Sequence, residues 1–185
     1  MAIEAELKAR VQNPEDVMAR LEEAYGPGRP EVYQDTYYDL PAGALTSGDR
    51  ELRIRTVHGA TDTRTVLTYK GARVDEVSGS KPEHETRVED ADAAHAILRG
   101  LGYAPTIAFE KRCRNYSFQL DGRDFLATLV RVPQIQGTFI ELETQAEPEG
   151  LAEALDAVRA ILATLGIGES DLTTEQYTDA VAAAR

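Results

Sequence analysis

Several short segments of the chain alternate charged and apolar residues with a period of two. Residues 3–8 read Ile-Glu-Ala-Glu-Leu-Lys, and residues 140–143 repeat the design as Ile-Glu-Leu-Glu. Residues 52–55 alternate leucine and isoleucine with two arginines, and residues 67–70 place a threonine and a lysine on one side. Side chains on a β-strand point alternately to opposite faces, so each segment predicts a strand with one ionic and one apolar face.

The rest of the pattern divides the chain into further strands and helices. Helices are expected at residues 15–25, 91–99, 151–165 and 174–184, where apolar residues recur at helical spacing or capping residues stand at the ends. Many antiparallel strands with a few helices predict an α+β, barrel-like fold. The expected strands are residues 2–10, 31–39, 50–58, 63–70, 82–89, 109–120, 124–132 and 138–144.

The helices decide which face of the strands points inward. Amphipathic helices need an apolar sheet surface to cover, so the apolar faces of the strands must lie outward, beneath the helices. The ionic faces then point into the barrel, and a closed barrel of about eight strands can enclose a ligand-sized interior. Although the formal net charge is −12, the basic residues cluster at a few strand positions, which is typical of a local anion site.

An interior lined by charges restricts the chemistry. Buried charges are costly unless they are paired or bound to a ligand, and clustered carboxylates repel one another unless a cation lies between them. Oxygen-only ligands suit Mg²⁺ or Mn²⁺, and lysines and arginines bind phosphate oxygens. The residues alone therefore predict a metal–polyphosphate site, but not which bond breaks.

Composition limits the other function classes. The net charge argues against a nucleic-acid binder, and no apolar run approaches the ~20 residues that span a bilayer. The N-terminus does not have the pattern of a signal peptide, and the single Cys113 excludes an internal disulfide. We therefore expect a cytoplasmic protein with a small-molecule substrate and neither a nucleic-acid nor a membrane partner, with a homodimer left open.

Taken in order, the segments resemble those of the CYTH superfamily, the triphosphate tunnel metalloenzymes. That family includes class IV adenylate cyclases, thiamine triphosphatases and tripolyphosphatases. Glu4-Ala5-Glu6-Leu7-Lys8 is similar to the family's ExExK signature. The other similar segments are residues 35–39 (DTYYD), 52–55 (LRIR), 68–71 (TYKG), 83–85 (ExE) and 141–143 (ExE).

The resemblance implies that residues 1–185 form a single triphosphate tunnel domain, an eight-stranded antiparallel β-barrel with helices packed on the outside. It implies a metal site for Mg²⁺ or Mn²⁺ made by Glu4, Glu6, Glu141 and Glu143. It implies catalytic roles for Glu4, Glu6 and Lys8. The expected phosphate-binding set is Lys8, Arg53, Arg55, Lys70, Lys111, Arg112 and Glu85.

The alternation of side chains along a strand indicates which of these residues point into the tunnel. Tyr116, Phe118 and Leu120 should pack under helices, which turns Lys111 toward the tunnel. The same parity turns Arg112 outward unless a bulge intervenes. Tyr177 could bring a phenol toward the tunnel mouth, although packing is the favoured interpretation.

The chain departs from the family pattern in two places. The family usually carries an aspartate in a segment like LDxV before the late ExE, whereas residues 125–140 contain no acid. A basic residue often stands two positions after Lys111, where this chain has Cys113, which we expect to be a packing or tunnel-wall residue. The missing acid removes an expected metal ligand.

The leading hypothesis is a divalent-metal-dependent phosphohydrolase acting on an inorganic or organic triphosphate or a related phosphorylated small molecule. A class IV adenylate cyclase, converting ATP to cyclic AMP and pyrophosphate, is the alternative, because both activities need the same triphosphate cradle. A non-catalytic phosphate-ligand binder is a second alternative, for which the missing aspartate is the sole support.

Overall fold

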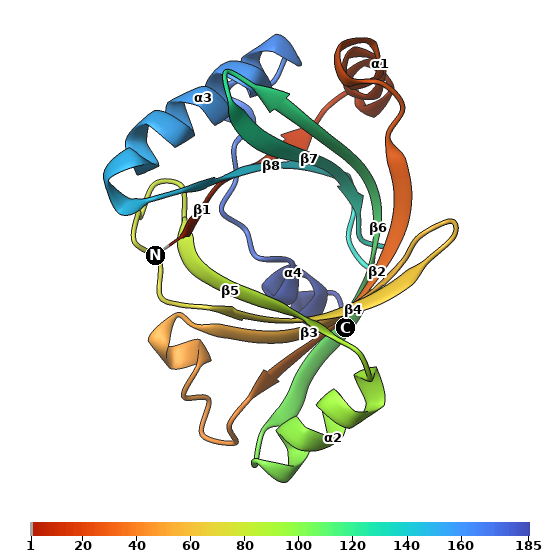
Figure 1. Ribbon diagram of the computed structural model, residues 1–185, viewed down its shortest axis with the longest axis vertical. Helices are drawn as coiled ribbons and strands as arrows, with labels where there is room; N and C mark the ends of the chain where they lie inside the picture. The colour runs from red at the N-terminus through yellow and green to blue at the C-terminus, as the bar shows by residue number, and fades with distance from the viewer. Residues whose placement is uncertain (1) are drawn as a thin grey trace.

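Residues 2–185 are described by a computed structural model, in which eight antiparallel strands close into a barrel accompanied by four helices (Figure 1). Around the barrel the strands follow the order β1-β5-β4-β3-β2-β6-β7-β8. The predicted α+β barrel is thereby confirmed. The strands are β1 (Ile3–Val11), β2 (Arg29–Asp39), β3 (Glu51–His58), β4 (Thr63–Lys70), β5 (Lys81–Val88), β6 (Ala104–Leu120), β7 (Arg123–Arg131) and β8 (Thr138–Ala146). The helices are α1 (Pro14–Tyr25), α2 (Ala91–Gly100), α3 (Leu151–Thr164) and α4 (Tyr177–Ala183).

The pairing of β1 with β8 sets the register of the two acidic strands. Glu6 lies directly opposite Glu143, and Lys8 lies opposite Glu141. Directly opposed residues point to the same face of a sheet, so the four side chains share the barrel interior. On its other edge β1 pairs with β5 at Ile3–Pro82 and Glu4–Lys81, which is where the ring closes.

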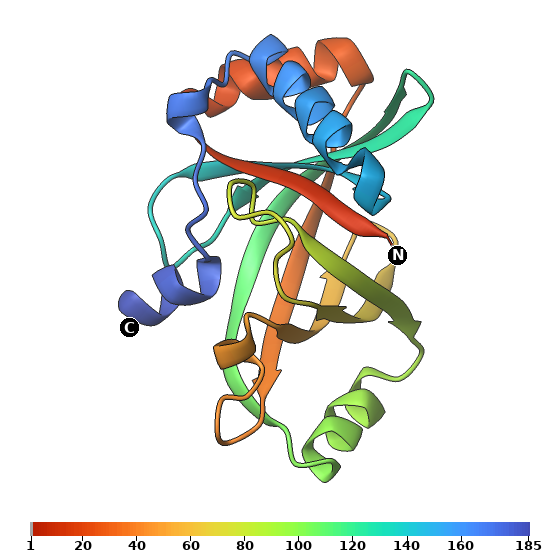
Figure 2. The ribbon, with the colours of Figure 1, turned by 90° about the vertical axis from the view of Figure 1, so that its left-hand side faces the viewer.

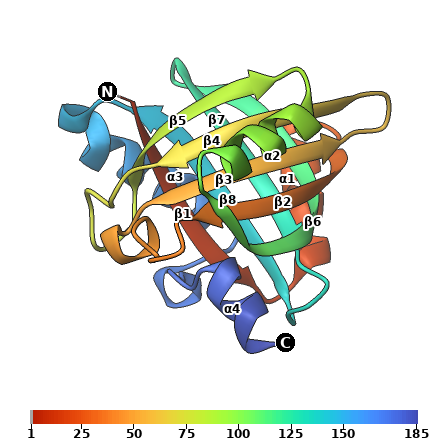
Figure 3. The same cartoon turned by 90° about the horizontal axis from the view of Figure 1, so that it is seen from below.

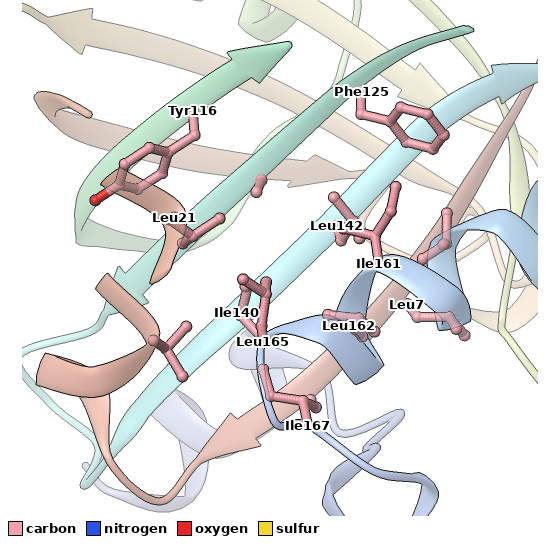
Figure 4. Close-up of a cluster of buried hydrophobic side chains, with 14 of the residues drawn as sticks. Leu7, Leu21, Tyr116, Phe125, Ile140, Leu142, Ile161, Leu162, Leu165 and Ile167 are labelled. Atoms are coloured by element: carbon pink, nitrogen blue, oxygen red, sulfur yellow. The ribbon is translucent and has the colours of Figure 1, made fainter. Parts of the chain in front are cut away.

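The apolar faces of β1, β7 and β8 lie beneath α1 and α3, as the orientation argument expects. Figure 4 shows Leu7, Ile140 and Leu142 on the strands facing Leu162 of α3, and all four are at most 4% exposed. Each such leucine or isoleucine contributes about 1.5–3 kcal/mol when it leaves water. This burial fixes the apolar face outward and therefore sends the ionic face inward.

The remaining helices are short. Asp90 caps α2 by accepting a hydrogen bond from the Ala93 N–H, and α2 covers Tyr38 and Ile54 with its own Leu98. Residues 104–108, which were not expected to be a strand, extend β6 because they pair with the end of β2. No helix among residues 2–185 is long and apolar enough to cross a membrane.

Helix α4 is placed differently from α1, α2 and α3. It lies near the C-terminus, apart from the other helices and at one end of the barrel (Figures 2 and 3), so in Figure 1 it is seen across the opening of the ring of strands. Its Val181 is fully buried in an apolar cluster with inward-facing Phe139 of β8 and Val130 of β7. The expected helix at 174–184 is therefore shorter than predicted and occupies one end of the barrel.

Candidate active site

All eight strands contribute side chains to one cavity of about 290 Å³ inside the barrel. Its walls are mainly charged, because the ionic faces of β1, β3, β5 and β8 meet there. The structure therefore brings together nearly all of the predicted site residues. Those that line the cavity are Glu4, Glu6, Lys8, Arg53, Arg55, Lys70, Glu85, Lys111, Glu141 and Glu143.

Three carboxylates form the acidic centre of the cavity. One oxygen from each of Glu4, Glu6 and Glu143 lies within 4.8 Å of the others. Burial, followed by the charge of Glu4, raises the pKa of Glu6 to about 7. Burial and the charges of Glu4 and Glu6 hold the pKa of Glu143 well above its usual value. The centre therefore carries more negative charge than its surroundings compensate.

Lys70 is the cation that faces this centre. It forms an ion pair with Glu4, and its Nζ lies 3.0 Å from Glu83 Oε2. Although burial alone would lower the pKa of Lys70, the charges of Glu4, Glu6 and Glu83 hold it well above its usual value. One lysine among these acids leaves a net negative site.

Glu141 behaves differently from the three clustered acids. Burial alone would raise the pKa of Glu141, but Lys111 and Lys8 outweigh burial and hold that pKa at about 2. Its carboxylate lies 3.5 Å from Lys111 Nζ, and Glu141 does not belong to the group with metal-ligand spacing. Glu141 is therefore a counter-charge for two lysines, and its predicted role as a metal ligand stays a prediction.

The two predicted phosphate-binding arginines differ in how far their guanidinium groups are already paired with other side chains. Arg55 donates two hydrogen bonds of 2.6 and 2.7 Å to the buried carboxylate of Asp35, which neutralises most of its charge. Arg53 donates to Thr68 at 3.3 Å and lies 4.0 Å from Glu85, while its buried Nε has no hydrogen-bond partner within residues 2–185. Arg53 is consequently the more available of the two for an anionic ligand.

Arg112 is the one predicted site residue that does not reach the cavity. Its side chain is 69% exposed on the outside of β6, where its Nε donates to Glu110 at 3.0 Å. The pairing of β6 with β2 and β7 is regular through residues 111–113, so side chains alternate and only Lys111 and Cys113 point inward. The expectation that Arg112 faces the phosphates is wrong, because the bulge that it requires is absent there.

Residues 125–140, which contain no acid, contribute to two different parts of the barrel interior. Leu126 and Thr128 line the cavity beside the acidic residues of β8. Val130 is fully buried directly opposite Cys113 and packs with Phe139 at the end of the barrel occupied by α4. Within residues 2–185, the carboxylates with metal-ligand spacing consequently come from β1 and β8 alone.

Sequence reasoning did not assign several residues that the structure brings to the site. Asp35 holds Arg55, Glu83 faces Lys70, and Glu51 pairs with Lys81 at 2.7 Å. Strand parity could have found Glu83, because it shares a face with Glu85. Tyr177, for which packing was favoured, lines the cavity as well, and no periodicity in the sequence indicates this.

The donor set can be tested for its fit to a divalent cation. Glu4, Glu6 and Glu143 offer only carboxylate oxygens, which are the ligands that Mg²⁺ and Mn²⁺ prefer over nitrogen or sulfur. The pKa values of Glu6 and Glu143 are raised first by burial and then by the charges of the neighbouring glutamates, so a cation between these carboxylates would offset the second cause. The residues therefore fit a small, hard divalent cation.

Comparisons with known proteins agree with this geometry. The sequence model of the CYTH domain family matches residues 2–177. The adenylate cyclase CyaB of Aeromonas hydrophila is 30% identical over 148 residues, which cover 78% of this chain and 69% of that protein. A protein of Methanocaldococcus jannaschii is 24% identical over 177 residues, 95% of this chain and 96% of its own length.

Solved structures show the same fold. A protein of Pyrococcus horikoshii OT3 superposes with a TM-score of 0.86 at 28% identity, covering 98% of this chain and 99% of its own. A protein from Hippeastrum, whose structure is described as revealing a dominant triphosphatase activity, superposes with a TM-score of 0.63 at 19% identity. That superposition covers 100% of this chain and 97% of the Hippeastrum chain.

Proposed function

The chain belongs to the CYTH domain family, and we propose that it is a divalent-metal-dependent phosphohydrolase that acts on an inorganic or organic triphosphate. Members of this family are adenylate cyclases or triphosphatases that act on triphosphate substrates and generally require a divalent metal.

One observation carries the proposal. The cluster of Glu4, Glu6 and Glu143 lies in the same cavity as Arg53, Lys8 and Lys111, so a carboxylate site for a cation adjoins a set of cations for an anion. A bound divalent cation would relieve the repulsion among the carboxylates and polarise phosphate oxygens. A triphosphate is the kind of ligand that satisfies both halves of such a cavity.

The residues of the chain take distinct roles in the proposed hydrolysis. Arg53, Lys8 and Lys111 bind the phosphate oxygens, while Lys70 forms an ion pair with Glu4. Glu6 is one of the three carboxylates that would hold the cation, and a carboxylate oxygen of this cluster can accept the proton of the attacking water molecule. The water oxygen then bonds to the terminal phosphorus, the bond from that phosphorus to the bridging oxygen breaks, and orthophosphate and the shortened polyphosphate leave.

The size of the cavity favours hydrolysis over cyclisation. At about 290 Å³ it lies just below the roughly 300–1,000 Å³ typical of small-molecule sites, and its lining is mainly charged. A triphosphate chain and a water molecule need such a lining. An adenine ring would need an apolar or aromatic surface, and the tyrosine rings that line the cavity already contact its arginines and lysines.

The test is an assay of three products at once. The protein is incubated with Mg²⁺ or Mn²⁺ and tripolyphosphate, ATP or thiamine triphosphate, and orthophosphate, pyrophosphate and cyclic AMP are measured together. Orthophosphate without cyclic AMP is the expected result. Cyclic AMP with pyrophosphate would establish the cyclase instead, and binding of the substrates without any product would establish a non-catalytic binder.

A double variant tests the acidic centre. Glu4→Gln with Glu6→Gln is expected to lose metal-dependent turnover by at least about 100-fold while it stays folded, because two of the three clustered carboxylates are gone. Glu23→Gln, an exposed residue of α1, is the matched control and is expected to retain full activity. Wild-type turnover in the double variant would contradict the assignment of the metal site.

A further inference from the structure

Tyr177, the first residue of α4, is buried at the end of the cavity that α4 occupies. It is 7% exposed, and its ring meets Phe139 of β8 edge-on at 5.4 Å between centroids. It lines the same cavity as the acidic centre and the phosphate-binding cations. The C-terminal segment therefore contributes an aromatic side chain to a site that is otherwise built by strands.

The ring of Tyr177 contacts two of the predicted phosphate-binding lysines. Lys8 Nζ lies 4.3 Å from the ring centroid, and Lys111 Nζ lies 4.4 Å from it. A cation near the face of an aromatic ring is attracted by the ring quadrupole, and the attraction increases when water is excluded. The ring thereby holds both ammonium groups at one place in the cavity.

The hydroxyl of Tyr177 is the feature that packing does not explain. Its oxygen is buried and has no hydrogen-bond partner in the part of the chain that the structure describes. Burial is the main cause that raises the pKa of Tyr177, and the nearby Glu141 carboxylate adds to it. Glu141 is therefore close to the hydroxyl, although the two groups lie outside the distance and angle of a hydrogen bond. Phenylalanine would fill the same space without burying an unpaired polar group, so the hydroxyl is expected to bind something absent from the protein itself.

The segment that carries Tyr177 is fixed to the barrel beside Lys8. The Thr173 N–H donates to the Lys8 carbonyl at 2.9 Å, and Leu172 forms a bridge with Ala9. At the far end of α4, Arg185 donates to the Ala108 carbonyl at 2.7 Å. These contacts on both sides hold the ring in one place, so the fold fixes the position of the hydroxyl.

We propose that Tyr177 is a substrate-contacting residue whose hydroxyl donates a hydrogen bond to a phosphate oxygen bound between Lys8 and Lys111. This inference rests on the proposed triphosphate substrate and adds a contact from α4 to it. The two ammonium groups supply the charge, and the hydroxyl supplies a directional donor that fixes the orientation of the phosphate. The C-terminal helix is then a functional part of the site rather than a cover for the end of the barrel.

The test is Tyr177→Phe, which removes the hydroxyl and keeps the ring and its contacts with both lysines. Binding of inorganic tripolyphosphate is measured by calorimetry in EDTA, and Mn²⁺ binding is measured separately without tripolyphosphate. The affinity for tripolyphosphate is expected to fall about 10- to 100-fold, the usual effect of losing a hydrogen bond to a charged group. The Mn²⁺ affinity is expected to stay within about 2-fold, because Tyr177 is outside the group with metal-ligand spacing.

The matched control is Tyr116→Phe. Tyr116 also buries a hydroxyl without a partner, but it packs in the apolar cluster outside the barrel and does not line the cavity. This control is expected to bind tripolyphosphate like the wild type. A second measurement uses wild-type protein labelled with 3-fluorotyrosine, in which the ¹⁹F resonance of Tyr177 is expected to shift when tripolyphosphate binds and that of Tyr116 is not.

Three outcomes would overturn the inference. Unchanged tripolyphosphate affinity in Tyr177→Phe, or a fixed Tyr177 resonance, would show that the hydroxyl makes no contact with the phosphate. A loss of Mn²⁺ affinity alone would show that Tyr177 acts through Glu141. If the wild type binds no triphosphate at all, the proposed function fails and this inference fails with it, a result distinct from a failure of Tyr177 alone.

Discussion

Replacing Glu6 by glutamine should stabilise the metal-free protein. The Glu6 carboxylate makes no hydrogen bond within residues 2–185, and it lies among Glu4, Glu141 and Glu143. Burial and these charges raise its pKa from 4.5 to about 7. The folded state therefore opposes ionisation of Glu6, and an uncharged side chain of the same shape removes that penalty.

The size of the effect follows from the shift in pKa. Each unit is worth about 1.36 kcal/mol, so 2.5 units correspond to a penalty on the order of 3 kcal/mol when Glu6 is ionised in both states. For a chain of this length, such a change raises Tm by about 6–12 °C.

The sign of the pH dependence is fixed as well. A carboxyl with a raised pKa in the folded state binds more protons when folded than when unfolded, so its contribution to stability falls as pH rises from about 4.5 to 7. The advantage of Glu6→Gln is therefore complete at pH 8 and is less than about 1 kcal/mol at pH 5.

The assay is urea unfolding of wild type and Glu6→Gln at pH 5 and pH 8, in EDTA and in Mn²⁺. With Mn²⁺ at 100 times its Kd the wild type gains about 2.7 kcal/mol, whereas the variant, which lacks one ligand of the cluster, gains much less. Bound Mn²⁺ is thus expected to make the wild type as stable as Glu6→Gln, or more stable, whereas in EDTA the variant is the more stable protein.

Glu141→Gln is the matched control on the facing strand. The pKa of Glu141 is held at about 2, so its charge stabilises the fold above about pH 4.5, and that contribution is lost as pH falls toward 2. Its neutralisation should destabilise the protein on the order of 3 kcal/mol at pH 8. If Glu6→Gln were also destabilising at pH 8 in EDTA, the reasoning about an undercompensated acidic centre would be refuted.

Three further predictions concern the cations and the metal. Asp35→Asn should destabilise the protein by about 3–5 kcal/mol in urea unfolding, because it leaves Arg55 as a buried charge without its partner; a loss under 1 kcal/mol would contradict this. Arg53→Ala should weaken tripolyphosphate binding at least 10-fold by calorimetry, whereas the exposed Arg112→Ala should leave it unchanged. The Kd for Mn²⁺, measured by calorimetry, should fall at least about 10-fold for each unit by which pH rises toward 7, because Glu6 loses its proton in this range; a Kd independent of pH would exclude Glu6 as a ligand.

The barrel could be predicted from the sequence because one rule, the alternation of faces along a strand, acts on every strand independently. It assigned Glu4 and Glu6 to one side, and the need of α1 and α3 for an apolar surface turned that side inward. The same rule gave Lys111 its inward direction. Leu120, which was expected to pack under a helix, is 42% exposed because it stands at the tip of the β6–β7 hairpin.

What the sequence could not give is the pairing between charges on different strands. Alternation shows that Glu141 and Glu143 share a face, but it does not show that Lys111 faces one while Glu4 and Glu6 face the other. That difference depends on the stagger of eight strands around the ring, and it separates the pKa values of two glutamates two residues apart. The position of Tyr177 depends on the path of residues 165–176 across the end of the barrel, which follows no period.

Residues 125–140 contain no interior acid, and the neighbouring strand β6 likewise has an uncharged residue, Cys113, at the facing position. Val130 lies directly opposite Cys113, and both are buried with Phe139 and Val181. A single carboxylate at Val130 would be buried there without a cation opposite it, because the thiol of Cys113, whose pKa burial raises to about 12, carries no charge at neutral pH. The neutral pair is therefore self-consistent: this end of the barrel is an apolar support for α4, and the acidic centre is confined to β1 and β8.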